Sequence, residues 1–307
     1  MNPSSIVVIG STNTDMVIMS EHLPAPGETI LGGSFFMNPG GKGANQAVAA
    51  QRLGGDVTFI AKTGNDIFGE RSAQLFKDEG INTDFLLTDP INPSGVALIT
   101  IDKSAENTIV VASGANASLN PVDLEPAIDV IKNAAIVLMQ LEIPLETVLY
   151  AAEIAVSNGV KVILNPAPAC PLPDVLFQYI SIITPNETEA EMLSGIRITD
   201  MESAKAAAMV IRSKGVDTVV ITLGAKGAFI SNADMEVLIP SPVVNAVDTT
   251  AAGDVFNGAL AVALAEGWTL IDAVSFGCRA AAISVTRLGA QAAAPYRHEI
   301  DLNQPNS

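Results

Sequence analysis

Short apolar runs alternate with helix-like stretches along most of this 307-residue chain. Apolar runs of four to eight residues are typical of buried strands, and the longer alanine-rich or amphipathic stretches between them are typical of helices. Strands that alternate with helices pair in parallel, and such a sheet needs helices on both faces. The pattern therefore predicts an α/β fold with a mostly parallel sheet. The predicted strands are 6–10, 57–61, 135–141, 160–164, 181–184 and 218–222, and the predicted helices are 43–53, 67–79, 145–157, 186–193, 201–214, 253–265 and 270–286.

Two stretches break this alternation. Residues from about 15 to 36 contain short strand-like pieces around Pro24, Pro26 and Gly27, and residues from about 95 to 111 read as two strands joined by a polar segment. Both are too short to form a domain of their own, so a single domain over 1–307 is expected. They could pair as a small sheet that projects from the core and covers a site. An ordinary edge hairpin fits the periodicity equally well.

Charge and composition narrow the function classes. The net charge is −17, which argues against binding to nucleic acid or to an anionic membrane, because both partners require a basic face. No Lys or Arg precedes Lys42, so the basic start of a signal peptide is missing, and we expect a cytoplasmic protein. The cysteines Cys170 and Cys278 are isolated, and His22 and His298 are the only histidines. Acid–base chemistry, if there is any, should therefore depend on a carboxylate.

The segment 248–254 is the strongest candidate for chemistry. Ala251, Ala252 and Gly253 have almost no side chain, so a ligand could approach the backbone N–H groups where a helix begins and where the helix dipole favours an anion. Asp254, in the first turn of that helix, could take the proton of a hydroxyl that attacks a phosphate held there. The alternative is that Asp254 only offsets the helix dipole.

Four other polar or glycine-rich segments follow strands or precede helices, at 10–15, 39–46, 184–189 and 222–227. Asn13 and Asp15 could accept hydrogen bonds from the neighbouring hydroxyls of a sugar. Lys42 and Asn45, expected to face outward, could hold a polyhydroxyl ligand. In the third segment, Asn186 and Glu189 could order the water ligands of a phosphate-bound magnesium ion, or could simply form a capping box.

Taken together, in this order and at these separations, the segments resemble the PfkB-type carbohydrate kinase family. The block 40–45, Gly-Gly-Lys-Gly-Ala-Asn, is similar to its first signature, the block 248–254 to its second, and the block 184–189 to its Asn-x-x-Glu motif. The similarity runs from about residue 6 to about residue 299. It implies a three-layer α/β/α core with a small β-sheet lid built from about 13–38 and 95–111. It also implies ATP-dependent phosphorylation of D-ribose at O5.

The resemblance also implies roles for individual residues. Asp254 would be the base, and the backbone of Ala251, Ala252 and Gly253 would form the anion hole. The sugar would be held by Asn13, Asp15, Gly41, Lys42, Asn45, Glu142 and Asp254. ATP would contact Asn186, Thr222, Gly224, Gly227 and Gly253, and Glu189 would act through Mg²⁺ and water. An activating K⁺ would be bound by the Asp248 carboxylate and by backbone carbonyls of Thr250, Ser284, Arg287 and Gly289, with Ala293 nearby.

Some departures and alternatives accompany the resemblance. Val255 stands where the family usually has Thr, and Ala251 where many members have Gly, although an alanine still offers its N–H. The acceptor could instead be 2-deoxyribose, a ketohexose or a nucleoside. The chain could also be a sugar-binding regulator that has lost catalysis, which the intact Asp254 argues against. Exposed edges of the lid sheet favour a homodimer through the lid.

Overall fold

The computed structural model describes residues 4–104 and 106–302, so the outer limits of the predicted 1–307 domain and residue 105 of the predicted lid lie outside the described residues. A nine-stranded sheet forms the centre, in the order β13-β12-β11-β10-β9-β8-β1-β4-β5. All neighbouring pairs are parallel except those that β12 makes with β11 and with β13, which confirms the mostly parallel sheet. The strands are β1 Ser5–Ile9, β4 Asp56–Gly64, β5 Leu86–Asp89, β8 Ile136–Met139, β9 Lys161–Leu164, β10 Ile182–Ile183, β11 Thr218–Thr222, β12 Ala228–Ser231 and β13 Glu236–Ile239.

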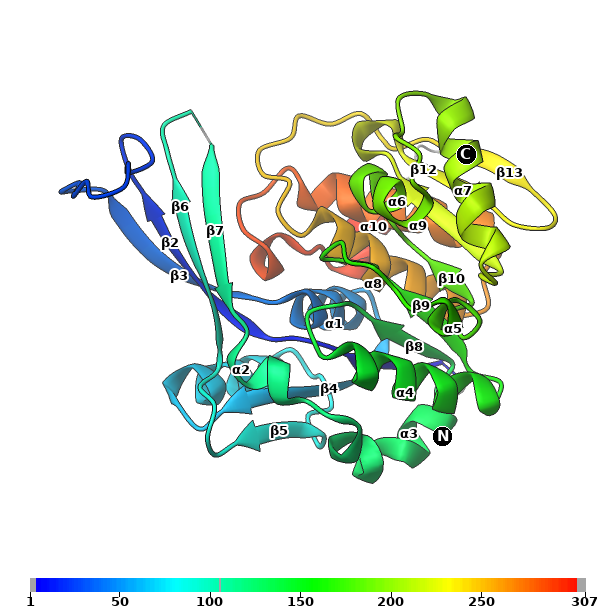
Figure 1. Cartoon of the computed structure of the whole chain (residues 1–307), viewed down its shortest axis with the longest axis horizontal. Helices are drawn as coiled ribbons and strands as arrows, with labels where there is room; N and C mark the ends of the chain where they lie inside the picture. The colour runs from blue at the N-terminus through cyan, green and yellow to red at the C-terminus, as the bar shows by residue number, and fades with distance from the viewer. Residues whose placement is uncertain (1–3, 105, 303–307) are drawn as a thin grey trace.

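Helices cover both faces of this sheet, as a parallel sheet requires. Successive residues of a strand point to opposite faces, so Ile6 and Val8 of β1 join one buried cluster while Val7 and Ile9 join the other. The first cluster includes side chains of α1 Lys42–Arg52, α2 Ile67–Asp78, α8 Ala252–Ala265, α9 Leu270–Ser284 and α10 Arg297–Leu302. The second includes side chains of α3 Ile128–Lys132, α4 Leu145–Ser157, α5 Asp174–Phe177, α6 Glu187–Ser194 and α7 Met201–Ser213 (Figure 1). The predicted three-layer α/β/α architecture is confirmed.

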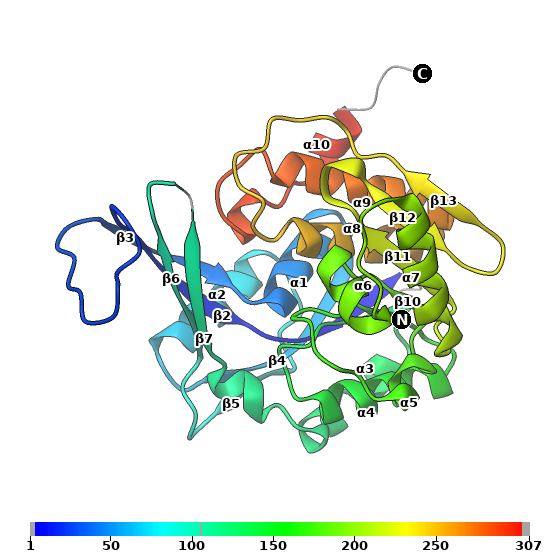
Figure 2. The same ribbon diagram turned by 45° about the horizontal axis from the view of Figure 1, so that its top comes forward.

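The two interrupting stretches pair as one small, separate sheet rather than as an edge hairpin. Its order is β3-β2-β6-β7, from β2 Asn13–Met19, β3 Ser34–Gly40, β6 Gly95–Ile101 and β7 Asn107–Ala112. Figures 1 and 2 both show it standing at one side of the layered body. Only residues 10–12 separate β1 from β2, and only Gly41 separates β3 from α1.

The order of the strands determines where a ligand can bind. The chain passes from β1 to β4 and β5 on one side, and later lays down β8 to β11 on the other, so the order reverses between β1 and β8. In open α/β sheets the carboxyl ends of strands at such a reversal form the ligand crevice. Residues 10–15 follow β1 and residues 140–142 follow β8, so the predicted polar segments reach this edge.

The structure also contains elements that the periodicity did not predict. They are the strands β5, β12 and β13, the helices α3, α5 and α10, and four 3₁₀ helices at Gly114–Ser118, Pro121–Ala127, Gly224–Lys226 and Gln291–Ala293. Within the described ranges, no helix combines the length and the apolar character needed to cross a lipid bilayer.

Candidate active site

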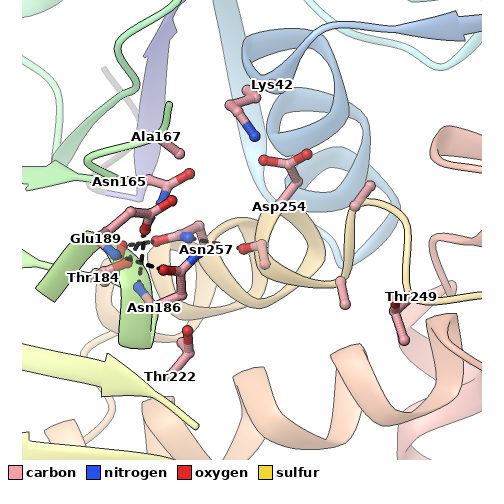
Figure 3. Close-up of a pocket in the computed structure, with 13 residues that line it drawn as sticks. Lys42, Asn165, Ala167, Thr184, Asn186, Glu189, Thr222, Thr249, Asp254 and Asn257 are labelled. Atoms are coloured by element: carbon pink, nitrogen blue, oxygen red, sulfur yellow. Dashed lines mark hydrogen bonds between the residues drawn. The ribbon is translucent and has the colours of Figure 1, made fainter. Parts of the chain in front are cut away.

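A pocket lies at the carboxyl edge of the sheet, between the loops after β9, β10 and β11 and the start of α8 (Figure 3). It draws on five separate parts of the chain and brings together two of the predicted signatures and the Asn-x-x-Glu motif. The lining residues are Lys42, Asn165, Ala167, Thr184, Asn186, Glu189, Thr222, Thr249, Ala251, Ala252, Gly253, Asp254 and Asn257.

Asp254 is the more deeply buried of the two acidic residues that line the pocket. It lies in the first turn of α8, as predicted, and is 5% exposed. Its Oδ2 accepts a hydrogen bond of 2.9 Å from Asn45 Nδ2, and its Oδ1 accepts one of 2.9 Å from Gln46 Nε2. Burial raises the pKa of Asp254, although Lys42 and the two amides act in the opposite direction. A carboxylate with a raised pKa is a better proton acceptor, as a general base requires.

The start of α8 is shaped to leave backbone amides accessible. Ala251 adopts a left-handed conformation, with φ of 58°, and directs the chain into the helix. The Ala252 N–H donates to the Thr249 carbonyl across a long 3.3 Å. A Cβ placed on Gly253 would meet nothing within 4 Å, so there is open space beside that backbone. The first N–H groups of a helix have no partner within it, and together with the helix dipole they favour an anion at this corner.

Carboxylates gather on the sugar side predicted from the sequence. Burial, followed by the nearby Glu142 and Asp254, raises the pKa of Asp15 to about 6. Glu142 Oε2 accepts hydrogen bonds from Ser11 Oγ at 2.5 Å and from the Lys42 backbone N–H at 3.0 Å. This side of the site therefore offers several oxygen acceptors next to Asp254.

Residues 40–45, the first signature, pack more tightly against the acidic residues of the site than we predicted. Asn45 does not face outward but is 7% exposed, because it bonds to Asp254, and its Oδ1 has no hydrogen-bond partner among the described residues. Gly41, with φ of 87°, packs so closely on Asn13 that a Cβ would lie 2.7 Å from the Asn13 N. The Asn13 side-chain Oδ1 accepts 2.8 Å from Asn116 Nδ2. Lys42 lines the pocket, as expected of a residue that meets a ligand.

Asn186 and Glu189 form the capping box that the sequence left as an alternative. Asn186 Oδ1 accepts 2.8 Å from the Glu189 N–H, and the Asn186 N–H donates 2.9 Å to Glu189 Oε2. Both residues nevertheless line the pocket, so capping does not remove them from it. Burial raises the pKa of Glu189, partly offset by the Asn186 N–H and by Lys42.

Of the predicted nucleotide contacts at the end of β11 and in the turn after it, only one lines the pocket. Thr222 lines the pocket, whereas Gly224 and Gly227 lie in the turn that follows and are outside the lining. Gly227 has φ of 105°, and a Cβ on it would be 2.0 Å from the Ile239 carbonyl, so the turn itself requires glycine there.

Two distant loops meet where the cation was predicted. Asp248 Oδ1 accepts 2.9 Å from the Thr250 N–H, and its Oδ2 accepts 2.9 Å from the Gly289 N–H. Burial works against the charge of Asp248, but hydrogen bonding from the Thr250 side chain, and then from the Gly289 and Thr250 N–H groups, lowers its pKa. Gly289 thus presents its N–H to Asp248, and the Ser284 carbonyl accepts 3.0 Å from the Arg287 N–H. Ala293 is buried in the adjacent 3₁₀ helix.

Four polar residues of the site were missed as candidates. Thr184 Oγ1 donates 2.7 Å to Asn257 Oδ1, and Asn257 Nδ2 donates 2.8 Å to the Gly253 carbonyl, which secures the start of α8. Gln46 bonds to Asp254 and, at 3.0 Å, to Asn165 Oδ1. Asn257 follows Asp254 by three residues and therefore shares its helix face. The polar Asn257 on this otherwise apolar helix face was the sequence signal that could have identified it as a site residue.

Comparisons with known proteins agree with this geometry. The model of the pfkB family carbohydrate kinase matches residues 3–297. Ribokinase of Haemophilus influenzae is 49% identical over 295 residues, covering 96% of each chain, and deoxyribokinase of Salmonella typhi is 38% identical over 291 residues, covering 94% of this chain and 95% of the relative. A solved structure of Arabidopsis thaliana ribokinase complexed with ribose and ATP has a TM-score of 0.93 at 32% identity and covers 97% of each chain. This chain therefore belongs to the pfkB family of carbohydrate kinases.

Proposed function

We propose that this protein transfers the γ-phosphoryl group of ATP to O5 of D-ribose, giving ribose 5-phosphate and ADP. The observation that carries the proposal is the buried Asp254 carboxylate beside the open backbone at the start of α8. The names of the relatives, and the ribose and ATP in the Arabidopsis structure, supply the substrate class.

The chemistry divides between these two features. Asp254 takes the proton of the O5 hydroxyl while that oxygen bonds to the γ-phosphorus, and the bond from phosphorus to the β,γ-bridging oxygen breaks to release ADP. The amides of Ala251, Ala252 and Gly253 stabilise the charge on the moving group. Asn13, Asp15, Gly41, Asn45 and Glu142 hold the sugar hydroxyls, and the unpartnered Oδ1 of Asn45 offers one acceptor for them.

The pocket also suits a nucleotide-bound divalent cation, which we propose to be Mg²⁺. Mg²⁺ keeps several waters and is usually bound by one or two carboxylates together with substrate phosphates. Glu189 is the acidic side chain on the nucleotide side, beside Asn186 and Thr222, and uses Oε2 for its cap. It would act on the ion through water, and the ion would neutralise phosphate charge.

An acceptor panel tests the proposal. ADP release is measured with ribose, 2-deoxyribose, fructose and adenosine at equal ATP, and ribose should give the highest kcat/KM. The 38% identity to Salmonella deoxyribokinase makes 2-deoxyribose the second candidate. A preference for any other acceptor would replace ribose in the proposal. No turnover on any of these acceptors would favour the alternative that the protein is a sugar-binding regulator without catalytic activity.

Acid should weaken ribose binding through Asp15. The pKa of Asp15 is raised to about 6, so the free enzyme gains this proton as the pH falls through 6 and loses an acceptor for sugar hydroxyls. The KM for ribose should therefore be level above pH 7 and rise below pH about 6, approaching tenfold per pH unit. Asp15→Asn should give a high KM that does not vary over this range. A wild-type KM that is constant from pH 7 to pH 5 would contradict the assignment.

Potassium should accelerate turnover. We propose that the lowered pKa of Asp248 keeps its carboxylate charged near the carbonyls of the 284–289 loop, and oxygen ligands suit an alkali cation. Turnover should be faster in KCl than in NaCl of equal ionic strength. Asp248→Ala and Asp248→Asn should remove the difference, whereas Asp234→Ala in an exposed turn should keep it. Equal wild-type rates in both salts would exclude the cation site.

The small sheet should act as a lid and as a dimer interface. Its outer strand β7 is exposed along its whole length, and Val110 is 67% exposed. We propose that two such sheets pair, which would cover apolar surface and the free strand edge. Sedimentation should show a dimer that Val110→Asp converts to monomers. Val122→Asp, equally 67% exposed but outside the sheet, is the matched control and should stay dimeric.

A further inference from the structure

A row of two buried amide side chains, Gln46 and Gln140, adjoins Asp254 outside the pocket lining. Gln46 Nε2 donates 2.9 Å to Asp254 Oδ1, and Gln46 Oε1 accepts 2.6 Å from Gln140 Nε2. Gln46 and Gln140 are both 0% exposed, and neither lines the pocket. They come from α1 and from the residue after β8, so the row joins a helix to the central sheet.

The hydrogen bonds leave Gln46 one orientation. Its NH₂ group has two acceptors, Asp254 Oδ1 and Asn165 Oδ1, while its oxygen faces the NH₂ group of Gln140. A flipped amide would place oxygen against both acceptors and NH₂ against a donor. Gln46 is therefore fixed as a donor toward the carboxylate.

The positive charge of Lys42 attracts the Asp254 carboxylate, and the hydrogen bonds from the amides compete with that attraction. Its ammonium group points toward the Asp254 carboxylate across the pocket in Figure 3, and its pKa is raised by Asp254, Glu142 and Glu189 despite burial. No ion pair within 4 Å joins Lys42 to Asp254 in the described part of the chain. The two amides hold both carboxylate oxygens instead, Asn45 on Oδ2 and Gln46 on Oδ1.

We propose that Gln46, oriented by Gln140, is a positioning residue that keeps the Asp254 carboxylate turned to the acceptor hydroxyl and away from Lys42. The proposal rests on the function assigned to Asp254 above. Gln46 does not itself line the pocket, and the lining residues that it bonds are Asp254 and Asn165, so its effect on the proton acceptor should reach the reaction through Asp254. Purely structural packing, in contrast, would affect stability without separating kcat from KM.

The test uses variants of similar length that cannot donate. Gln46→Met should lower kcat about 10- to 100-fold, the range for one hydrogen bond to a charged group, and should leave the KM for ribose near wild type. Gln140→Met should lower kcat in the same direction but less. The double variant should be no worse than Gln46→Met alone, because Gln140 acts through Gln46. Gln51→Met, on the same helix and remote from Asp254, is the matched control and should keep wild-type kcat.

The pH profile gives a second readout. Loss of a donor that favours the charged carboxylate should move the acidic limb of kcat to higher pH in Gln46→Met. The charged groups that face Asp254, namely Lys42, Asp15, Glu142 and Glu189, are unchanged in these variants. Melting temperatures show whether each variant folds. Should Gln46→Met not fold, Gln140→Met carries the test, since its side chain does not contact Asp254.

Three results would overturn the proposal. The first is a folded Gln46→Met variant with the kcat and the acidic limb of the wild type. The second is a loss of kcat in the double variant that equals the combined losses of the two single variants. The third is an effect of Gln46→Met on the KM for ribose alone. Asp254→Asn is measured alongside these variants, and a strongly lowered kcat in it, together with any of the three results, would reject the role of Gln46 and keep the proposed function. An active Asp254→Asn would instead reject the assignment of the base.

Discussion

Replacing Asp254 with asparagine should lower kcat roughly 10²- to 10⁴-fold, the usual contribution of a general base. Asparagine keeps the size of the side chain and can still occupy the space between Asn45 and Gln46, but it cannot accept the proton of the sugar hydroxyl. Ribose binding should be largely kept, because most of the proposed sugar contacts are on other residues. Steady-state kinetics and calorimetric titration with ribose measure the two effects separately.

A matched control separates chemistry from helix stability. Asp272 is also an acid in the first turn of a helix, in α9, and it lies outside the pocket lining. Asp272→Asn should therefore retain wild-type kcat even if the helix loses a little stability. Near-normal turnover in Asp254→Asn would remove that residue from the base role.

Replacing Lys42 with methionine should be nearly as damaging. Among the described residues, Lys42 is the one basic side chain in the pocket lining, in a chain with a net charge of −17. The nearby Asp254, Glu142 and Glu189 hold its pKa above the ordinary value, so it stays charged and can offset the phosphates of ATP. We expect kcat to fall about 10²- to 10³-fold, as for the loss of one transition-state donor, and the KM for ATP to rise.

The control for that variant is Lys205→Met on α7, which is also a lysine in a helix but does not line the pocket. It should leave kcat and both KM values unchanged. If Lys42→Met turned over ribose at the wild-type rate, Mg²⁺ and the helix amides alone would have to neutralise the nucleotide.

The long, regular elements could be predicted from the sequence because their periodicity is local. The helix at 145–157 and the strand at 218–222 have the predicted bounds. The hairpin of β12 and β13 was missed because it is short, partly exposed and antiparallel to the neighbouring strand, so the alternation rule does not apply to it. β10 has only two residues, and its pairing with β9 and β11 defines it.

The site could be predicted as a set of segments but not as a set of orientations. The motifs identified Asp254, Asn186 and Glu189, and the structure brings these residues together. The prediction that the Asn45 side chain faces outward was wrong, because its direction depends on how closely α1 packs on α8. A Cβ on Gly258 would lie 2.9 Å from the Gln46 carbonyl, so this approach needs glycine. That contact joins residues more than 200 positions apart, which local periodicity cannot show.

The short connections between the two sheets have a kinetic consequence. Any rotation of the small sheet must be absorbed at its four connections to the body, residues 10–12, Gly41, residues 90–94 and residue 113, and the first two are flanked by Asn13 and Lys42. If the sheet acts as the lid that we propose, a sugar that binds one orientation of the sheet better would shift the population toward it, and the rate at which the sheet swings back would limit how fast the phosphorylated sugar departs. Substitutions far out on β6 or β7 should therefore change residence times of the pentose without touching it.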